Sequence, residues 1–148
     1  MTLMTGGCQC GRIRYAIEIA DDEAYLCHCG MCRRATGGVS IAFRSVRAAD
    51  VAWTTREPDW YASSPIARRA FCSACGTPLG FRFLEGSETM DLTVGSFDDP
   101  GHFRPTSHFA IESALPAWRD TTHLPGHRLD EHPPLVDRWR KAVGKLPD

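Results

Sequence analysis

The chain has 148 residues, of which 43% are hydrophobic and 24% charged, a formal net charge of −1 and a pI near 6.6. This composition is typical of one globular domain that buries its own core, and no apolar run approaches the ~20 residues that a membrane-spanning helix needs. The near-neutral charge lacks the basic face of nucleic-acid-binding proteins, so we expect a soluble protein that binds neither nucleic acid nor membrane.

The N-terminal part of the chain reads as strands joined by short turns. Apolar and polar residues alternate over residues 12–20, which is the pattern of a strand with one buried face. The first cysteines, Cys8 and Cys10, therefore precede a strand. An acidic turn follows, and residues 24–27 predict a short strand that leads into Cys27. Residues 29–38 predict a compact loop or one helical turn.

The middle of the chain continues this pattern, with Pro, Gly and acidic turns between the segments. The further predicted strands are residues 39–44, 60–63, 67–72, 79–83 and 90–94. Their spacing predicts a mainly β, predominantly antiparallel fold. After the turn at residues 98–101 prolines recur, and we expect a long, strand-poor wrap over the sheet.

The C-terminal end predicts a helix. Beyond Pro133-Pro134, apolar residues share one helical face opposite charged ones, namely Leu135, Val136, Trp139 and Val143. We predict a single β domain over residues 1–132 and a short amphipathic helix over residues 133–148. Docking of the helix on its own domain is the expected role, and a dimer contact is the alternative.

The seven cysteines form three clusters, Cys8-x-Cys10, Cys27-x-Cys29-x-x-Cys32 and Cys72-x-x-Cys75. Thiolates this close in sequence can converge on one tetrahedral ion at about 2.3 Å. The first and third clusters supply four thiolates, enough for a closed structural site. The second cluster then offers three, which leaves one coordination position open, and open positions are where zinc does chemistry. We predict two zinc ions per chain, one structural and one catalytic.

The cysteines allow other interpretations. Disulfides are disfavoured because seven is odd and a bridge within Cys8-x-Cys10 is strained. Residues 1–7 contain no secretory signal, so we expect reduced thiols and a cytoplasmic location. A thioredoxin-like pair at Cys72 and Cys75 would stand between a strand and a helix, whereas residues 76–78 predict a turn into another strand. An iron–sulfur cluster remains an alternative, because four thiolates can bind iron as well as zinc.

Histidines could also contribute ligands. His28 could close the second site, but a side chain between two ligands in an extended segment points to the opposite face. Each of the other histidines could in principle reach the metal through the fold, although a surface or hydrogen-bonded role is expected for each, namely His102, His108, His123, His127 and His132.

The cysteines lie within longer motifs, which are residues 6–11 (GGCQCG), 27–37 (CHCGMCRRATG) and 71–79 (FCSACGTPL), with a tail containing His108, Ser113 and the sequence LPAW at 115–118. In order and spacing these motifs resemble the glutathione-dependent formaldehyde-activating enzymes and the related domain of centromere protein V. The resemblance implies a zinc-containing β-fold of the kind shared with a Rab nucleotide-release factor. It also implies a structural zinc on Cys8, Cys10, Cys72 and Cys75 and a catalytic zinc on Cys27, Cys29 and Cys32.

The ligand set suggests what such a catalytic site would do. Three thiolates weaken a divalent ion as an acid towards water, but a soft, open site captures a thiol and holds it as a thiolate. With glutathione as co-substrate and formaldehyde as electrophile, the product is S-hydroxymethylglutathione, and the reverse reaction cleaves its carbon–sulfur bond. We therefore predict a carbon–sulfur lyase, monomeric or homodimeric. The alternatives are a non-catalytic zinc-binding interaction module and a lyase for another thiol adduct.

Further residues have predicted roles in this reaction. Arg33 and Arg34 directly follow Cys32 and could bind the carboxylates of glutathione or neutralise the thiolates. Arg44, Arg68 and Arg69 are weaker candidates, and for Arg68 and Arg69 we expect solvated surface charges. His108 is the preferred proton carrier because it lies in the tail motif and an imidazole titrates near neutral pH. Glu112 could assist it, and Trp118 is expected to be a core aromatic.

Overall fold

The computed structural model describes residues 1–147, and the chain divides into two compact units, Met1–Leu115 and the remainder from Pro116. The described part of the first unit holds ten strands in two sheets, which confirms the predicted mainly β class. Within residues 1–147 no helix combines the length and apolar character needed to cross a bilayer.

The smaller sheet has the strand order β1-β2-β5, with β1 at Thr2–Gly7, β2 at Arg14–Ile19 and β5 at Ala52–Trp53, all antiparallel. Only β2 was predicted. Strand β1 was not predicted because it ends in two glycines, which interrupt the alternation of apolar and polar residues. Gly6 is nevertheless required at its position. A Cβ at Gly6 would come within 2.4 Å of the Tyr15 ring, so the strand can pack closely only without a side chain.

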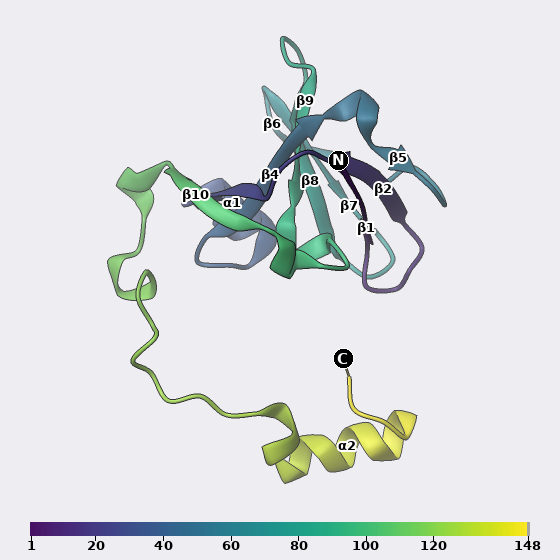
Figure 1. The fold of residues 1–148 in the computed structure, drawn as a ribbon, viewed down its shortest axis with the longest axis vertical. Helices are drawn as coiled ribbons and strands as arrows, with labels where there is room; N and C mark the ends of the chain where they lie inside the picture. Colours follow the sequence, from purple (N-terminus) through teal and green to yellow (C-terminus); the bar gives the residue numbers. More distant parts are fainter. Residues whose placement is uncertain (148) are drawn as a thin grey trace. The chain divides into compact units, whose positions relative to one another are not determined.

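The larger sheet has the order β10-β3-β4-β9-β8-β7-β6, and Figure 1 labels its strands except β3. Its strands are β3 (Glu23–Cys27), β4 (Ile41–Arg47), β6 (Asp59–Ser64), β7 (Ala67–Phe71), β8 (Pro78–Phe83), β9 (Thr89–Thr93) and β10 (Arg104–Phe109). All pairs are antiparallel except β10, which runs parallel to β3. The expectation of a strand-poor segment after the turn at residues 98–101 is wrong at Arg104–Phe109, which forms strand β10. It escaped prediction because it is an edge strand whose six residues are all exposed, so no alternation marks it.

The two faces of the larger sheet have different roles, because successive residues of a strand alternate between faces. One cross-strand row, Leu92–Gly80–Ala70, belongs to the main core, where it packs with Tyr15 and Ile17 of the smaller sheet. The next row places Ser45, Asp91, Phe81 and Arg69 side by side on the opposite face. This second face carries the candidate site.

Helix α1, Gly30–Thr36, is longer than the loop or single turn predicted there. Cys29 caps its start, because the Cys29 Sγ accepts a hydrogen bond from the Cys32 backbone N–H at 3.3 Å. Gly37 ends the helix in the left-handed region with φ of 76°, a conformation that glycine adopts without strain. A cysteine in place of the usual Ser or Asp hid the cap from prediction.

The remaining elements are short. Six 3-10 helices occur in the described residues, η1 (Ala48–Asp50), η2 (Val94–Ser96), η3 (Pro100–His102), η4 (Ile111–Ser113), η5 (Pro116–Trp118) and η6 (Leu129–Glu131). In the C-terminal unit, α2 (Pro133–Val143) confirms the predicted short helix. It begins after His132, whose Nδ1 accepts from the Leu135 N–H at 3.3 Å, and ends at Gly144. Its docking on residues 1–132 stays a prediction.

Candidate functional site

The first and third cysteine clusters lie together, as the number of cysteines in each cluster led us to predict. The Sγ atoms of Cys8, Cys10, Cys72 and Cys75 all lie within 4.8 Å of one another. Two of these separations are 3.5 Å for Cys8–Cys10 and 3.8 Å for Cys10–Cys72. Four sulfurs at about 2.3 Å from a tetrahedral zinc lie about 3.8 Å apart, so the arrangement fits a closed four-thiolate site. All seven cysteines are free thiols.

Two turns of the same construction present these thiols. The carbonyl of Cys8 accepts from the Gly11 N–H at 3.0 Å, and the carbonyl of Cys72 accepts from the Gly76 N–H at 2.7 Å. Gly11 and Gly76 have φ of 79° and 80°, which disfavours any residue with a side chain. The second turn leads directly into strand β8, which argues against a thioredoxin-like pair at Cys72 and Cys75.

A salt bridge supports this cluster. Arg12 Nη1 lies 2.8 Å from Asp59 Oδ2 and 4.0 Å from Cys72 Sγ. The Ser73 backbone N–H donates to the same carboxylate at 2.8 Å. The Ser73 N–H and then the Arg12 guanidinium lower the pKa of Asp59 to about 2. The carboxylate therefore stays ionised and holds the Arg12 guanidinium beside the four thiols. This positive charge would offset the negative charge that four thiolates would have in excess of one divalent ion.

The second cluster forms where strand β3 passes into helix α1. Cys27 ends the strand, Cys29 caps the helix and Cys32 lies one turn into it, and their three Sγ atoms lie within 4.8 Å of one another. The ring of His28 is turned to His108 instead, with 2.8 Å between His28 Nε2 and His108 Nδ1. Within residues 1–147 this group contains cysteines alone, so its donor set fits a metal with one open position.

The three thiols ionise unequally. Burial raises the pKa of Cys27 to about 12, and burial also raises the pKa of Cys32 against the opposing effect of the Arg69 guanidinium. Burial acts against Cys29 too, but hydrogen bonds from the Cys32 backbone N–H and the neighbouring thiols give it a lowered pKa. A metal ion requires all three as thiolates and releases their protons on binding.

Arg69 is the main residue that the sequence analysis misjudged. The expected surface charge is wrong, because Arg69 is only 5% exposed and its Nη2 lies 3.4 Å from Cys32 Sγ. Its guanidinium also stacks on Phe81, 5.0 Å from the ring centroid, while Arg68 stacks on Trp60. Two consecutive arginines in a strand must point to opposite faces, and this signal could have singled out one of them as inward.

The two other predicted arginines differ from each other. Arg33 Nη1 donates to the carbonyls of His28 at 2.8 Å and Ser113 at 2.7 Å, so it joins helix α1 to the end of β3 and to η4. Arg34 is exposed. Its Nη1 lies beside Gly30 in the first turn of α1, 3.1 Å from the position that a Cβ on Gly30 would occupy. Glutathione binding by either arginine stays a prediction.

A pocket of about 500 Å³ opens at the three cysteines. Aromatic side chains dominate its lining, namely Tyr25, Phe43, Phe81, Phe83 and Phe109. Asp91 and Glu112 supply its carboxylates. Burial raises the pKa of Asp91, although hydrogen bonds with Ser45 and Tyr25 oppose the rise. His108 is exposed and is not among the described residues that line the pocket. Asp91 was not predicted, because nothing in the sequence distinguishes an aspartate that faces a pocket from any other aspartate in a strand.

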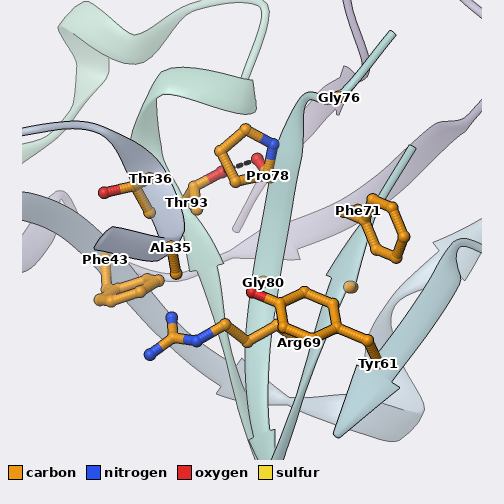
Figure 2. A pocket seen from close by; sticks show the side chains of 11 residues that line it. Ala35, Thr36, Phe43, Tyr61, Arg69, Phe71, Gly76, Pro78, Gly80 and Thr93 are labelled. Atoms are coloured by element: carbon orange, nitrogen blue, oxygen red, sulfur yellow. Dashed lines mark hydrogen bonds between the residues drawn. The ribbon is translucent and has the colours of Figure 1, made fainter. Parts of the chain in front are cut away.

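A smaller pocket of about 200 Å³ lies close by, and Figure 2 shows its lining. Phe43 and Arg69 line both pockets. Here the Thr93 hydroxyl donates to the Pro78 carbonyl at 2.9 Å, and Tyr61 contributes an aromatic ring. No cysteine is among the described residues that line it, so the larger pocket is the candidate reaction site.

Comparisons with known proteins bear on this site. The family model described as "Glutathione-dependent formaldehyde-activating enzyme" matches residues 3–113, a range that contains all seven cysteines and the pocket. An uncharacterized lyase of Schizosaccharomyces pombe is 33% identical over 92 residues, which are 62% of this chain and 66% of that protein. The chain thus spans just under two thirds of the length of this curated relative. A crystal structure of a Rhodobacter sphaeroides protein shares the fold at a TM-score of 0.55 and 23% identity, over 72% of this chain and all of that one.

Proposed function

Because the chain belongs to the family of glutathione-dependent formaldehyde-activating enzymes, we propose that it is a carbon–sulfur lyase that forms and cleaves S-hydroxymethylglutathione. The observation that carries the proposal is the three-thiol cluster that opens into a pocket beside a separate four-thiol cluster. A purely structural protein would need neither the incomplete ligand set nor the pocket.

The residues divide into two ligand sets. Cys8, Cys10, Cys72 and Cys75 would hold a structural zinc, and Cys27, Cys29 and Cys32 would hold a catalytic one. Zinc held by these three thiolates would supply an open position that favours the ionised form of an added thiol such as glutathione. Arg69 offsets negative charge at this cluster from 3.4 Å, and the exposed Arg34 would bind a carboxylate of glutathione.

The reaction needs one proton transfer. When the thiolate sulfur forms a bond to the aldehyde carbon, a carbonyl electron pair moves to oxygen, which takes a proton. Cleavage reverses these changes. His108 is the carrier predicted from the tail motif, but its Nδ1 bonds His28, whereas Asp91 lines the pocket and burial favours its protonated form. Asp91 is therefore the better donor to the carbonyl oxygen.

Asparagine at Asp91 should lower kcat by about 100-fold, because an amide cannot deliver the proton. The raised pKa keeps Asp91 protonated to a higher pH than an exposed aspartate, so the rate of adduct formation should fall as the pH rises through that pKa, and this limb should vanish in the variant. Rates are followed by NMR exchange between glutathione and its adduct. A larger loss in His108→Gln than in Asp91→Asn would return the role to His108.

The proposal is tested with cobalt(II) in place of zinc, because the visible spectrum of cobalt reports a change of ligand. Glutathione should alter the spectrum, and S-methylglutathione, which has no thiol, should not. The zinc-loaded protein should also accelerate exchange among glutathione, formaldehyde and their adduct. An unchanged cobalt spectrum together with no acceleration would overturn the proposal and favour a non-catalytic interaction module.

One observation favours a second candidate, a lyase for another thiol adduct. Arg33 is occupied by two backbone carbonyls and Arg69 by the Cys32 thiol, so few guanidinium groups remain for the two carboxylates of glutathione. Titration of the cobalt protein with 2-mercaptoethanol distinguishes the two. An uncharged thiol that binds more tightly than glutathione would support the second candidate.

A further inference from the structure

The pocket beside the three cysteines is far larger than formaldehyde requires. Its volume of about 500 Å³ lies in the range of sites for whole organic ligands, whereas formaldehyde has two heavy atoms. The cavity extends from Cys27, Cys29 and Cys32 to Ile66 and Phe83. Glutathione would bind the cluster through its sulfur, and Arg34, which would bind its carboxylate, lies outside the described lining of this pocket. Most of the space would therefore stay unfilled unless the aldehyde carried a substantial side group.

The surroundings of this space are apolar. Phe43 is buried and Tyr25 and Phe81 are partly buried on its inner side, and exposed apolar side chains continue around its mouth. Ile66 and Phe109 are 64% and 66% exposed, which is a cost in water unless a ligand covers them. Aromatic walls of this kind favour an arene or a branched alkyl group, which gains contact on both ring faces and edges.

The charged groups of the pocket also indicate which kind of ligand group it favours. Its one guanidinium among the described residues, Arg69, is turned to Cys32 Sγ, and its carboxyl groups are Asp91 and Glu112. A ligand with its own carboxylate would meet the Glu112 carboxylate, would gain no charge pairing from a protonated Asp91 and would find no available cation. The group that fills the pocket is therefore uncharged.

The rim at Phe109 is held in place by the backbone. The His28 N–H donates to the Phe109 carbonyl at 3.0 Å, and the Phe109 ring meets Tyr25 edge to face, with centroids 6.5 Å apart. The next residue, Ala110, has φ of 54°, an unfavourable conformation for a residue with a Cβ. This bend brings Ala110 and Glu112 back to the pocket, so the exposed ring belongs to a built wall.

We infer that this enzyme also accepts, in place of formaldehyde, an aldehyde that carries an uncharged aryl or branched alkyl group, which occupies the apolar pocket, and this inference rests on the proposed function. The thiolate sulfur bonds to the aldehyde carbon, the carbonyl π bond breaks, and its electrons take the proton lost by the thiol. The product is a hemithioacetal, and no oxidant or reductant is needed.

The inference is tested with the full-length, zinc-loaded protein, glutathione and three aldehydes. Benzaldehyde should react with a kcat/KM at least about tenfold above that of formaldehyde, since burying a ring adds binding that formaldehyde lacks. 4-Carboxybenzaldehyde has a ring of the same size with a negative charge and should lose that advantage. Exchange NMR measures all three rates.

A variant removes the aromatic rim. Phe109→Ala should lower the benzaldehyde-to-formaldehyde ratio of kcat/KM by about tenfold. Leu3→Ala removes an equally exposed apolar side chain outside the pocket, and its ratio should match the wild type. Benzyl alcohol has no carbonyl, and its binding, followed through the backbone amide signals of Ala67 and Ala110, gives a readout that needs no reaction.

The outcomes separate the inference from the proposed function. Formaldehyde turnover with no preference for benzaldehyde, or a ratio that Phe109→Ala leaves unchanged, would overturn the inference while the function stands. Benzyl alcohol binding in the pocket without turnover of any aldehyde would overturn the proposed function, and the aldehyde assignment with it. Faster turnover of benzaldehyde together with the loss in Phe109→Ala supports both.

Discussion

Serine at Cys29 should abolish carbon–sulfur exchange and remove about half of the bound metal while the protein stays folded, because one of two sites loses a thiolate. Serine is the informative replacement here. Its hydroxyl can accept the Cys32 N–H as the Cys29 Sγ does, so the cap of helix α1 survives. The change therefore reports on the metal ligand and leaves the helix intact. Metal analysis, circular dichroism and exchange NMR on the same sample measure the three expected effects.

Serine at Cys72 is the matched control, and its effect should be on folding. The Cys72 side chain is fully buried in the main core, and its cluster supplies four thiols, a full tetrahedral ligand set. Structural zinc contributes roughly 10–16 kcal/mol to small zinc domains, so loss of one ligand in four should lower the free energy of unfolding by about 3 kcal/mol. Denaturant unfolding measures this loss. Equal destabilisation by Cys29→Ser and Cys72→Ser would contradict the division into a structural and a catalytic site.

Methionine at Arg69 should weaken glutathione binding by at least about tenfold, which corresponds to about 1.4 kcal/mol. Three thiolates already outweigh the charge of a divalent ion, and an added thiolate increases the excess. Arg69 supplies the opposing charge 3.4 Å from Cys32 Sγ from a position that is 5% exposed, where water screens little. Methionine keeps the apolar stem of the side chain and removes the charge. Titration of the cobalt-substituted protein with glutathione measures the dissociation constant.

Two further variants separate charge from shape. Arg69→Lys retains the positive charge but loses the planar group that stacks on Phe81, so its affinity should lie between those of wild type and Arg69→Met. Arg68→Met removes the neighbouring arginine, which stacks on Trp60, and should bind glutathione as the wild type does. An Arg69→Met protein that is folded and keeps full affinity would exclude the neutralising role.

Much of the fold could be predicted because its signals are local. Strands β2 and β4 show apolar and polar residues in alternation. Strands β7, β8 and β9 were predicted from segments that lie between Pro, Gly and acidic turns, and all the predicted boundaries differ from the observed ones by a few residues at most. Strands β1 and β10 were missed for physical reasons, since close packing requires glycine in one and exposure of the whole strand removes the alternation from the other. The cap of α1 was missed because its acceptor is a thiol.

The grouping of the cysteines into one set of four and one set of three could be predicted from the chain alone, because the cysteines within each cluster stand two or three residues apart and only a few geometries can join them. The pocket was not readable, because its walls come from strands distant in sequence. Arg69, Phe81 and Asp91 lie in one row through the pairing of β7, β8 and β9, and neither composition nor local pattern encodes which face of a strand that pairing turns towards the cysteines. Strand register, set by burial of the opposite face in the main core, therefore brought a cation, an acid and an aromatic wall to the three thiols.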